Sequence, residues 1–138
     1  MQRFLDWQQE TPRGKIQLAV TLRSTGELIG NVGLRQSIPA AHEAEIGYEL
    51  SPASWGCGYA TEAARAMLAF GFSARGLHRI HAYCIAENVA SVRVLEKLGM
   101  HCEERLHMHE WFKGRWWGVW RYSIGQQEWQ EPPWNSCA

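Results

Sequence analysis

The chain has 138 residues, and its 14 Lys and Arg residues are balanced by 14 Asp and Glu residues. This length supports one domain with a single core, and the balanced charge argues against a nucleic-acid-binding protein, which uses an excess of cations. No apolar stretch reaches the roughly 20 residues of a membrane span, and the start lacks a signal-peptide layout, so we expect a cytoplasmic protein without a membrane partner.

The chain begins with two different patterns. Residues 3–9 are predicted to be the end of a helix, because a proline and a glycine follow them as stop signals. We therefore interpret residues 1–14 as the remnant of an N-terminal helical segment. Apolar and polar residues then alternate over 16–22, and a turn at 24–27 leads into a second apolar run at 28–34. This pattern predicts an antiparallel hairpin.

Two further segments frame the middle of the chain. Residues 43–50 are predicted to form a strand, in which Ile46, Tyr48 and Leu50 are apolar while Glu45 and Glu49 share the other face. After a glycine-rich turn, residues 61–75 have the apolar stripe of an amphipathic helix that Gly76 ends.

The second half repeats the alternation of strand and helix. We predict a strand at 79–85, then a helix with Asn88 as its N-cap and Gly99 at its end. Residues 101–124 form a long hairpin that turns near 113–114, and 125–138 is a tail without a period. The order indicates one α/β domain over 1–138, with a mixed, mostly antiparallel central sheet flanked by helices.

The turn at residues 55–61 has the composition of an anion-binding loop. Its two glycines let several backbone N–H groups point to one place, and the N-terminus of the following helix favours negative charge there. A diphosphate fits such a site. The Walker pattern fails because no Gly-Lys-Ser/Thr follows, and the dinucleotide fingerprint fails at Thr61. A tight strand-to-helix turn without a ligand explains the same residues.

Three motifs in this order resemble the GNAT acetyltransferase superfamily. They are residues 45–50, the run 55–63, and the segment 88–100 with Asn88, Ser91 and Leu-Glu-Lys-Leu-Gly-Met at its end. The likeness covers about residues 15–124 and is similar, more narrowly, to the ribosomal-protein N-terminal acetyltransferases. It implies acetyl-CoA as cosubstrate, no metal, and direct transfer to a primary amine in a ternary complex. It also implies that the strands at 43–50 and 79–85 splay apart to hold the cofactor.

The resemblance assigns residues to the cofactor. Backbone amides of the loop would hold the diphosphate, those near Tyr48 and Leu50 would hold the thioester oxygen, and Asn88 would contact cofactor or substrate. The loop residues concerned are Trp55, Gly56, Cys57, Gly58, Tyr59, Ala60 and Thr61.

Catalysis needs a base, because an amine attacks only when it is neutral. At neutral pH, deprotonation costs a lysine-like amine roughly 4 to 5 kcal/mol and an α-amino group about 1 kcal/mol, which favours a peptide N-terminus as acceptor. Glu45 and Glu49 are the candidate bases, and Glu45 stands where related family members keep theirs. Solvated strand carboxylates would look the same. Ser91 is the candidate proton donor for the departing thiolate, since Leu95 replaces the tyrosine of many GNAT enzymes.

Several alternatives stay open at this point. The acceptor is also compatible with a small amine such as an aminoglycoside or a polyamine, and the chain with an acyl-CoA-binding module that has lost turnover. Asn88 can serve as a helix cap alone. Two histidines, His107 and His109, lack a third ligand in register, so we assign no metal.

The hairpin and the chain start carry two more expectations. The tryptophans of the terminal hairpin are expected to pack as cross-strand core pairs, or to wall the acceptor pocket that borders this hairpin in the family. These residues are Trp111, Trp116, Trp117 and Trp120. The resemblance also implies that the first strand and most of the first helical segment are missing. Residues 15–23 would then form an open edge, which predicts a homodimer or an exchanged strand.

Overall fold

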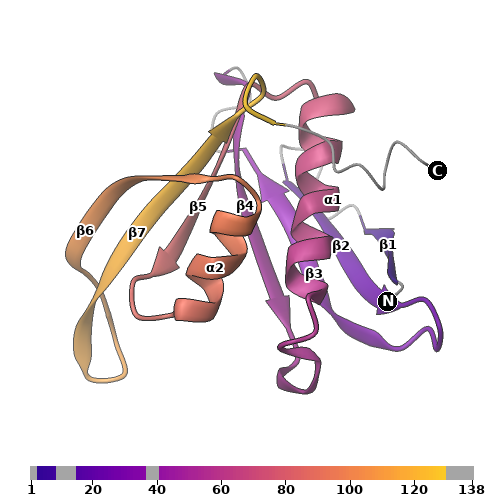
Figure 1. Ribbon diagram of the computed structural model, residues 1–138, viewed down its shortest axis with the longest axis horizontal. Helices are drawn as coiled ribbons and strands as arrows, with labels where there is room; N and C mark the ends of the chain where they lie inside the picture. Colours follow the sequence, from indigo (N-terminus) through magenta and orange to yellow (C-terminus); the bar gives the residue numbers. More distant parts are fainter. Residues whose placement is uncertain (1–2, 9–14, 37–40, 130–138) are drawn as a thin grey trace.

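The computed structural model describes residues 3–8, 15–36 and 41–129, and for 3–8, 107–110 and 112 only the backbone. These residues form a sheet with two helices packed on it (Figure 1). The elements in chain order are β1 (Arg3–Gln8), β2 (Lys15–Leu22), β3 (Leu28–Arg35), β4 (Glu43–Leu50), the 3-10 turn η2 (Pro52–Ser54), α1 (Tyr59–Ser73), β5 (Arg79–Ile85), α2 (Val89–Lys97), β6 (His101–Phe112) and β7 (Arg115–Gly125).

The seven strands lie in the order β1-β2-β3-β4-β5-β7-β6. Every neighbouring pair is antiparallel except β4 and β5, which run parallel because α1 connects them as a crossover. The predicted mixed, mostly antiparallel sheet flanked by helices is therefore confirmed. Within the described residues, no helix is long and apolar enough to cross a membrane.

Both helices cover the same face of the sheet. The core side of α1 contributes Met67 and Leu68, which are fully buried, and each such side chain stabilises the fold by about 1.5–3 kcal/mol. The Arg65 side chain joins the two helices by donating from Nη2 to the Lys97 carbonyl oxygen at 2.9 Å. The opposite face carries no helix in the described part of the chain, and we call it the helix-free face.

Strands β4 and β5 separate along their length. They are paired only at their first residues, and the pair of Glu45 with His81 is the last one. Beyond it β4 stays paired with β3, and β5 with β7, so the two strands diverge (Figure 1). The predicted splay is present, and α2 lies on the core side of the gap.

The chain start differs from the prediction. Residues 3–8 form strand β1, paired with β2 from Arg3 opposite Leu22 to Gln8 opposite Gln17, so the predicted helix end at 3–9 is wrong. The stop signals were interpreted from local sequence, whereas this strand is stabilised by pairing with a distant segment. The predicted open edge at residues 15–23 is wrong for the same reason. The expected homodimer remains a prediction without that support.

The terminal hairpin turns where expected, at Lys113 and Gly114. Trp111 and Trp116 pair across it with ring centroids 5.6 Å apart, but they are 59% and 47% exposed, so they are not core residues. After β7 the chain folds back, and Trp129 packs against Phe72 of α1 at 5.9 Å between ring centroids.

Candidate active site

The loop between β4 and α1 is held in place at its first residue. The Trp55 indole Nε1 donates to the Leu50 carbonyl oxygen at 2.9 Å, and the side chain stays 66% exposed. The indole is thus fixed at the end of β4. The exposed Cys57 Sγ lies 3.7 Å from the Trp55 carbonyl oxygen.

Two glycines give the loop its shape. Gly56 and Gly58 both have φ of +79°, a conformation that costs other residues about 1–2 kcal/mol. No atom lies within 4 Å of a Cβ built at either position, so the backbone conformation, and not packing within this chain, requires glycine here.

Gly58 is the N-cap of α1. The first intrahelical bond runs from the Glu62 N–H to the Gly58 carbonyl oxygen at 3.1 Å. The amides of Ala60 and Thr61 therefore have no acceptor inside the helix. Because these donors stand at the positive end of a helix of 15 residues, the loop is suited to bind an anion.

Residues of β4 and α2 meet at the splay. The Tyr48 hydroxyl and Ser91 Oγ are 3.1 Å apart and hydrogen-bonded, which joins the diverging strand to α2. Burial raises the pKa of Tyr48, and the bond to Ser91 offsets part of this rise. The phenol is protonated near neutral pH. Leu95 is 1% exposed and faces the core, so the residue that replaces the family's tyrosine has a packing role.

Asn88 caps α2 as predicted. Its Oδ1 accepts the Ser91 N–H at 3.1 Å, and α2 begins at the next residue. This bond uses the carbonyl oxygen of the side chain, and the amide NH₂ group stays available for a second contact. Leu50 belongs to the core, so it offers only its backbone to a ligand.

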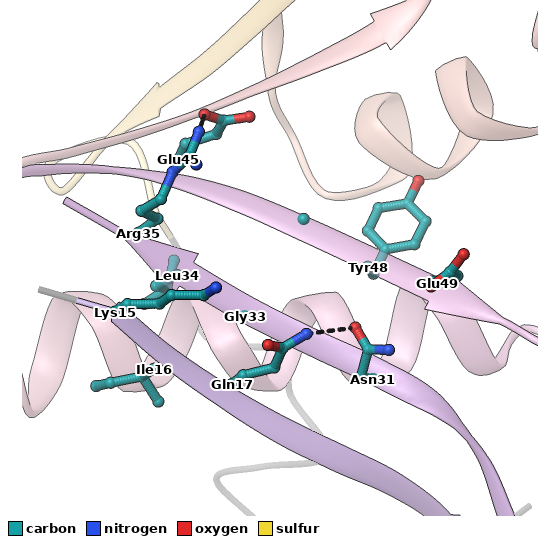
Figure 2. Close-up of a pocket in the computed structure, with 11 residues that line it drawn as sticks. Lys15, Ile16, Gln17, Asn31, Gly33, Leu34, Arg35, Glu45, Tyr48 and Glu49 are labelled. Carbon is teal, nitrogen blue, oxygen red and sulfur yellow. Dashed lines mark hydrogen bonds and ion pairs between the residues drawn. The ribbon is translucent and has the colours of Figure 1, made fainter. Parts of the chain in front are cut away.

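The two candidate bases lie on the helix-free face, along a groove of about 380 Å³. Glu45 Oε1 pairs with Arg35 Nη2 at 3.2 Å, and the carboxylate is 31% exposed (Figure 2). Glu49 is exposed and makes no ion pair among the described residues. Both therefore face the same groove, but only Glu45 stands where β4 and β5 part.

Two glycines without side chains, Gly33 and Gly47, form the floor of the groove near Glu45 and Glu49, and we call them the glycine floor. Gly47 of β4 is paired with Gly33 of β3, and Gln17 of β2 completes the row. Gln17 Nε2 donates to Asn31 Oδ1 at 3.0 Å on the wall of the groove (Figure 2). A Cβ built on Gly47 meets no atom within 4 Å. The space above Gly47 is therefore open between Glu45 and Glu49 along β4, whereas a Cβ built on Gly33 would lie 2.7 Å from the Ile16 carbonyl oxygen, so Gly33 allows the close approach of the β2 backbone.

Sequence reasoning missed the Arg35 ion pair and this glycine floor. Both glycines sit inside predicted strands, where glycine weakens a strand and often marks the close approach of a ligand or another backbone. The two glycines inside predicted strands were therefore the sequence signal that could have indicated the groove. The described residues contain no group of three or more His, Cys, Asp or Glu side chains that could hold a metal ion, and the side chains of His107 and His109 lie outside them.

Known proteins are similar to this chain in sequence and in fold. The family described as Acetyltransferase (GNAT) domain matches residues 1–101. The uncharacterized N-acetyltransferase YnaD of Bacillus subtilis is 38% identical over 110 residues, which are 80% of this chain and 64% of YnaD. A GNAT-family acetyltransferase structure from Bacillus anthracis superposes with a TM-score of 0.75 at 36% identity, covering 81% of this chain and 67% of the other.

A further structure is the spermidine/spermine N-acetyltransferase SpeG of Vibrio cholerae. It superposes with a TM-score of 0.78 at 26% identity and covers 84% of this chain and 68% of that chain. The chain belongs to the GNAT acetyltransferase family. It spans slightly less than two thirds of the length of YnaD.

Proposed function

We propose that the protein is an acetyl-CoA-dependent N-acetyltransferase that transfers the acetyl group directly to a primary amine in a ternary complex. The observation that carries this proposal is the geometry of one edge of β4. The anion-binding loop at 55–61 follows β4, and β4 separates from β5 beyond Glu45. A diphosphate on the loop would leave the pantetheine chain free to enter the gap.

The backbone of β4 supports the binding of the thioester. Residues 46–50 are paired with β3 on one side only, because β5 has diverged on the other. Their outward N–H groups are suited to hold the thioester oxygen as negative charge develops on it. This arrangement makes the tetrahedral intermediate the species that the site stabilises most.

The acceptor is proposed to enter from the helix-free face. A cationic amine in the groove would lie over the Gly33–Gly47 floor, with Glu49 at one end and the Glu45–Arg35 pair at the other. The carboxylate of Glu49, which has no ion-pair partner in the described part of the chain, and the spermidine/spermine acetyltransferase relative support a polyamine as acceptor. The narrower likeness to ribosomal-protein N-terminal acetyltransferases supports a peptide N-terminus instead.

The test measures binding and transfer separately. We expect acetyl-CoA to raise the melting temperature of the protein, because a ligand that binds only the folded state stabilises it. Free CoA thiol should then appear with spermidine and not with a peptide bearing a free N-terminus or with an aminoglycoside. Binding without thiol release for any acceptor would identify a non-catalytic acyl-CoA-binding module. Release with the peptide alone would identify an N-terminal acetyltransferase.

The departing thiolate needs a proton, and the Tyr48–Ser91 pair is placed to deliver one. Replacing Ser91 with Ala is expected to lower kcat about tenfold, a modest loss because a thiolate is already a good leaving group. The dissociation constant of acetyl-CoA should stay the same. Tyr48→Phe keeps the ring and removes the phenolic proton, so it should reproduce the loss. An unchanged kcat in both variants, measured by steady-state kinetics, would contradict this assignment.

A further inference from the structure

His81 lies where β4 and β5 part. It pairs with Glu45 in the last of the three residue pairs that join these strands. Its neighbours Ile80 and Ala82 are buried in the core, so the His81 side chain points to the helix-free face, as Glu45 does. The imidazole and the Glu45 carboxylate are thus adjacent at the point where β4 and β5 begin to diverge.

One ring nitrogen of His81 is buried without a partner. Among the described residues, no hydrogen bond reaches its Nδ1. Buried polar atoms are nearly always paired, so such an exception requires an explanation. The Tyr83 ring meets the imidazole edge-on, with centroids 5.6 Å apart, and fixes its orientation without offering an acceptor atom. The structure thus holds an oriented imidazole beside the proposed thioester position, and no group in the described part of the chain hydrogen-bonds to its Nδ1.

Burial and the charges around His81 together set the pKa of its imidazole. Burial lowers the pKa of His81 below its ordinary value of 6.5, and Arg121 on β7 lowers it further. Glu45 and Glu43 on β4 and Glu103 on β6 act in the opposite direction. The imidazole is therefore unprotonated near neutral pH, where it can act as a base. The nearby carboxylates stabilise the imidazolium once it forms.

We propose that His81 accepts the proton of the acceptor amine and that Glu45 stabilises the resulting imidazolium. This rests on the proposed function. An imidazole is intrinsically a stronger base than a carboxylate, with ordinary pKa values of about 6.5 and 4.3. Glu45 also has one oxygen engaged by Arg35, so it is better placed to supply charge than to take the proton alone.

The proton and the electron pairs balance in one sequence of steps. The amine lone pair attacks the thioester carbon, the N–C bond forms, and the N–H proton passes to the His81 ring. The tetrahedral intermediate collapses, the C–S bond breaks, and the CoA thiolate leaves with the C–S electron pair. The thiolate takes a proton from the Tyr48–Ser91 pair, and solvent exchange resets both groups. The proton that His81 takes up equals the proton that the Tyr48–Ser91 pair gives to the thiolate, so the net products are the N-acetylated amine and CoA thiol. An acceptor that enters as an ammonium ion releases one further proton to solvent before it attacks.

The experiment uses His81→Gln, Glu45→Gln and the double variant, with spermidine as the acceptor. Each single change should lower kcat about 100-fold near neutral pH, with partial recovery at high pH where the amine loses its own proton. Because the two side chains act as one unit, the double variant should lose little more than either single variant. His101→Gln is the matched control, since His101 is exposed on β6 and paired with Glu128 at 3.1 Å.

NMR titration gives a readout that does not depend on turnover. The His81 imidazole should titrate below 6.5 in the wild type and lower still in Glu45→Gln. A His81 pKa above that value, an unchanged kcat and pH profile in His81→Gln, or losses that multiply in the double variant would each overturn the proposal. If His81→Gln fails to fold, His81→Asn and the wild-type titration decide. A wild-type protein that binds no acetyl-CoA would instead refute the proposed function.

Discussion

Gly58→Ala is expected to weaken acetyl-CoA binding about 10- to 100-fold, as measured by isothermal titration calorimetry. Gly58 has φ of +79° and caps α1, and an alanine there would favour a different backbone conformation. The amides of Ala60 and Thr61 would then point away from the diphosphate. Losing the equivalent of one hydrogen bond to a charged group, which contributes about 1.5–3 kcal/mol, accounts for a change of this size.

The matched control for this prediction is Gly26→Ala. Gly26 has φ of +76°, no atom within 4 Å of a built Cβ, and a position in the turn between β2 and β3. Both variants should lose about 1–2 kcal/mol of unfolding free energy, because both place alanine in the left-handed region. Only Gly58→Ala should change the dissociation constant. Equal affinities in the two variants would show that the loop does not hold the cofactor.

Glu45→Gln is expected to lower kcat about 100-fold near neutral pH, because His81 loses the carboxylate that stabilises its imidazolium and proton transfer to a positioned base typically contributes this much. The change removes the negative charge at the point where β4 and β5 begin to diverge, and it leaves the size of the side chain nearly unchanged. Part of the loss should be recovered at high pH, because a free amine no longer needs a base. The pH dependence of kcat with saturating acetyl-CoA measures this directly.

Glu49→Gln separates the carboxylate that assists the base, Glu45, from the carboxylate that binds the acceptor, Glu49. Glu49 lies on the same strand and the same face, but away from the part of β4 that pairs with β5. We expect it to raise the KM for spermidine and to leave kcat nearly unchanged, since it contacts the acceptor without taking its proton. A normal kcat in Glu45→Gln together with a low kcat in Glu49→Gln would reverse the two roles.

Much of the fold could be predicted because its signals are local. The strand at Glu43–Leu50 and the strand at Arg79–Ile85 were predicted with the bounds that the structure has, since period-two patterns are bounded there by turn residues. The helix α1 begins at Tyr59, two residues before its predicted start. Helix ends are commonly uncertain by this amount, because the N–H groups of the first turn have no intrahelical acceptor.

The chain start could not be predicted in the same way. Strand β1 depends on its pairing with β2, and nothing in residues 3–8 themselves distinguishes a strand edge from the end of a helix. A proline and a glycine follow either kind of element. Tertiary pairing therefore decided the structure of this segment.

In the candidate site, as in the fold, some features can be predicted from local sequence and others depend on tertiary structure. The glycine loop and the strand carboxylates are visible in the sequence as short motifs. The bond between Tyr48 and Ser91 joins residues 43 positions apart, and the Glu45–His81 pair depends on the parallel register of β4 and β5. His81 was not singled out, although it lies in a predicted strand opposite the apolar set that begins with Ile80. Its importance depends on neighbours that only the fold brings together.

The most direct test of this account is a crystal structure of the protein with acetyl-CoA. The account predicts the diphosphate within hydrogen-bond distance of the Ala60 and Thr61 amides, and the thioester between β4 and β5 beside Glu45. A cofactor bound elsewhere on the protein, or a loop at Gly56 and Gly58 left empty at saturating acetyl-CoA, would contradict it.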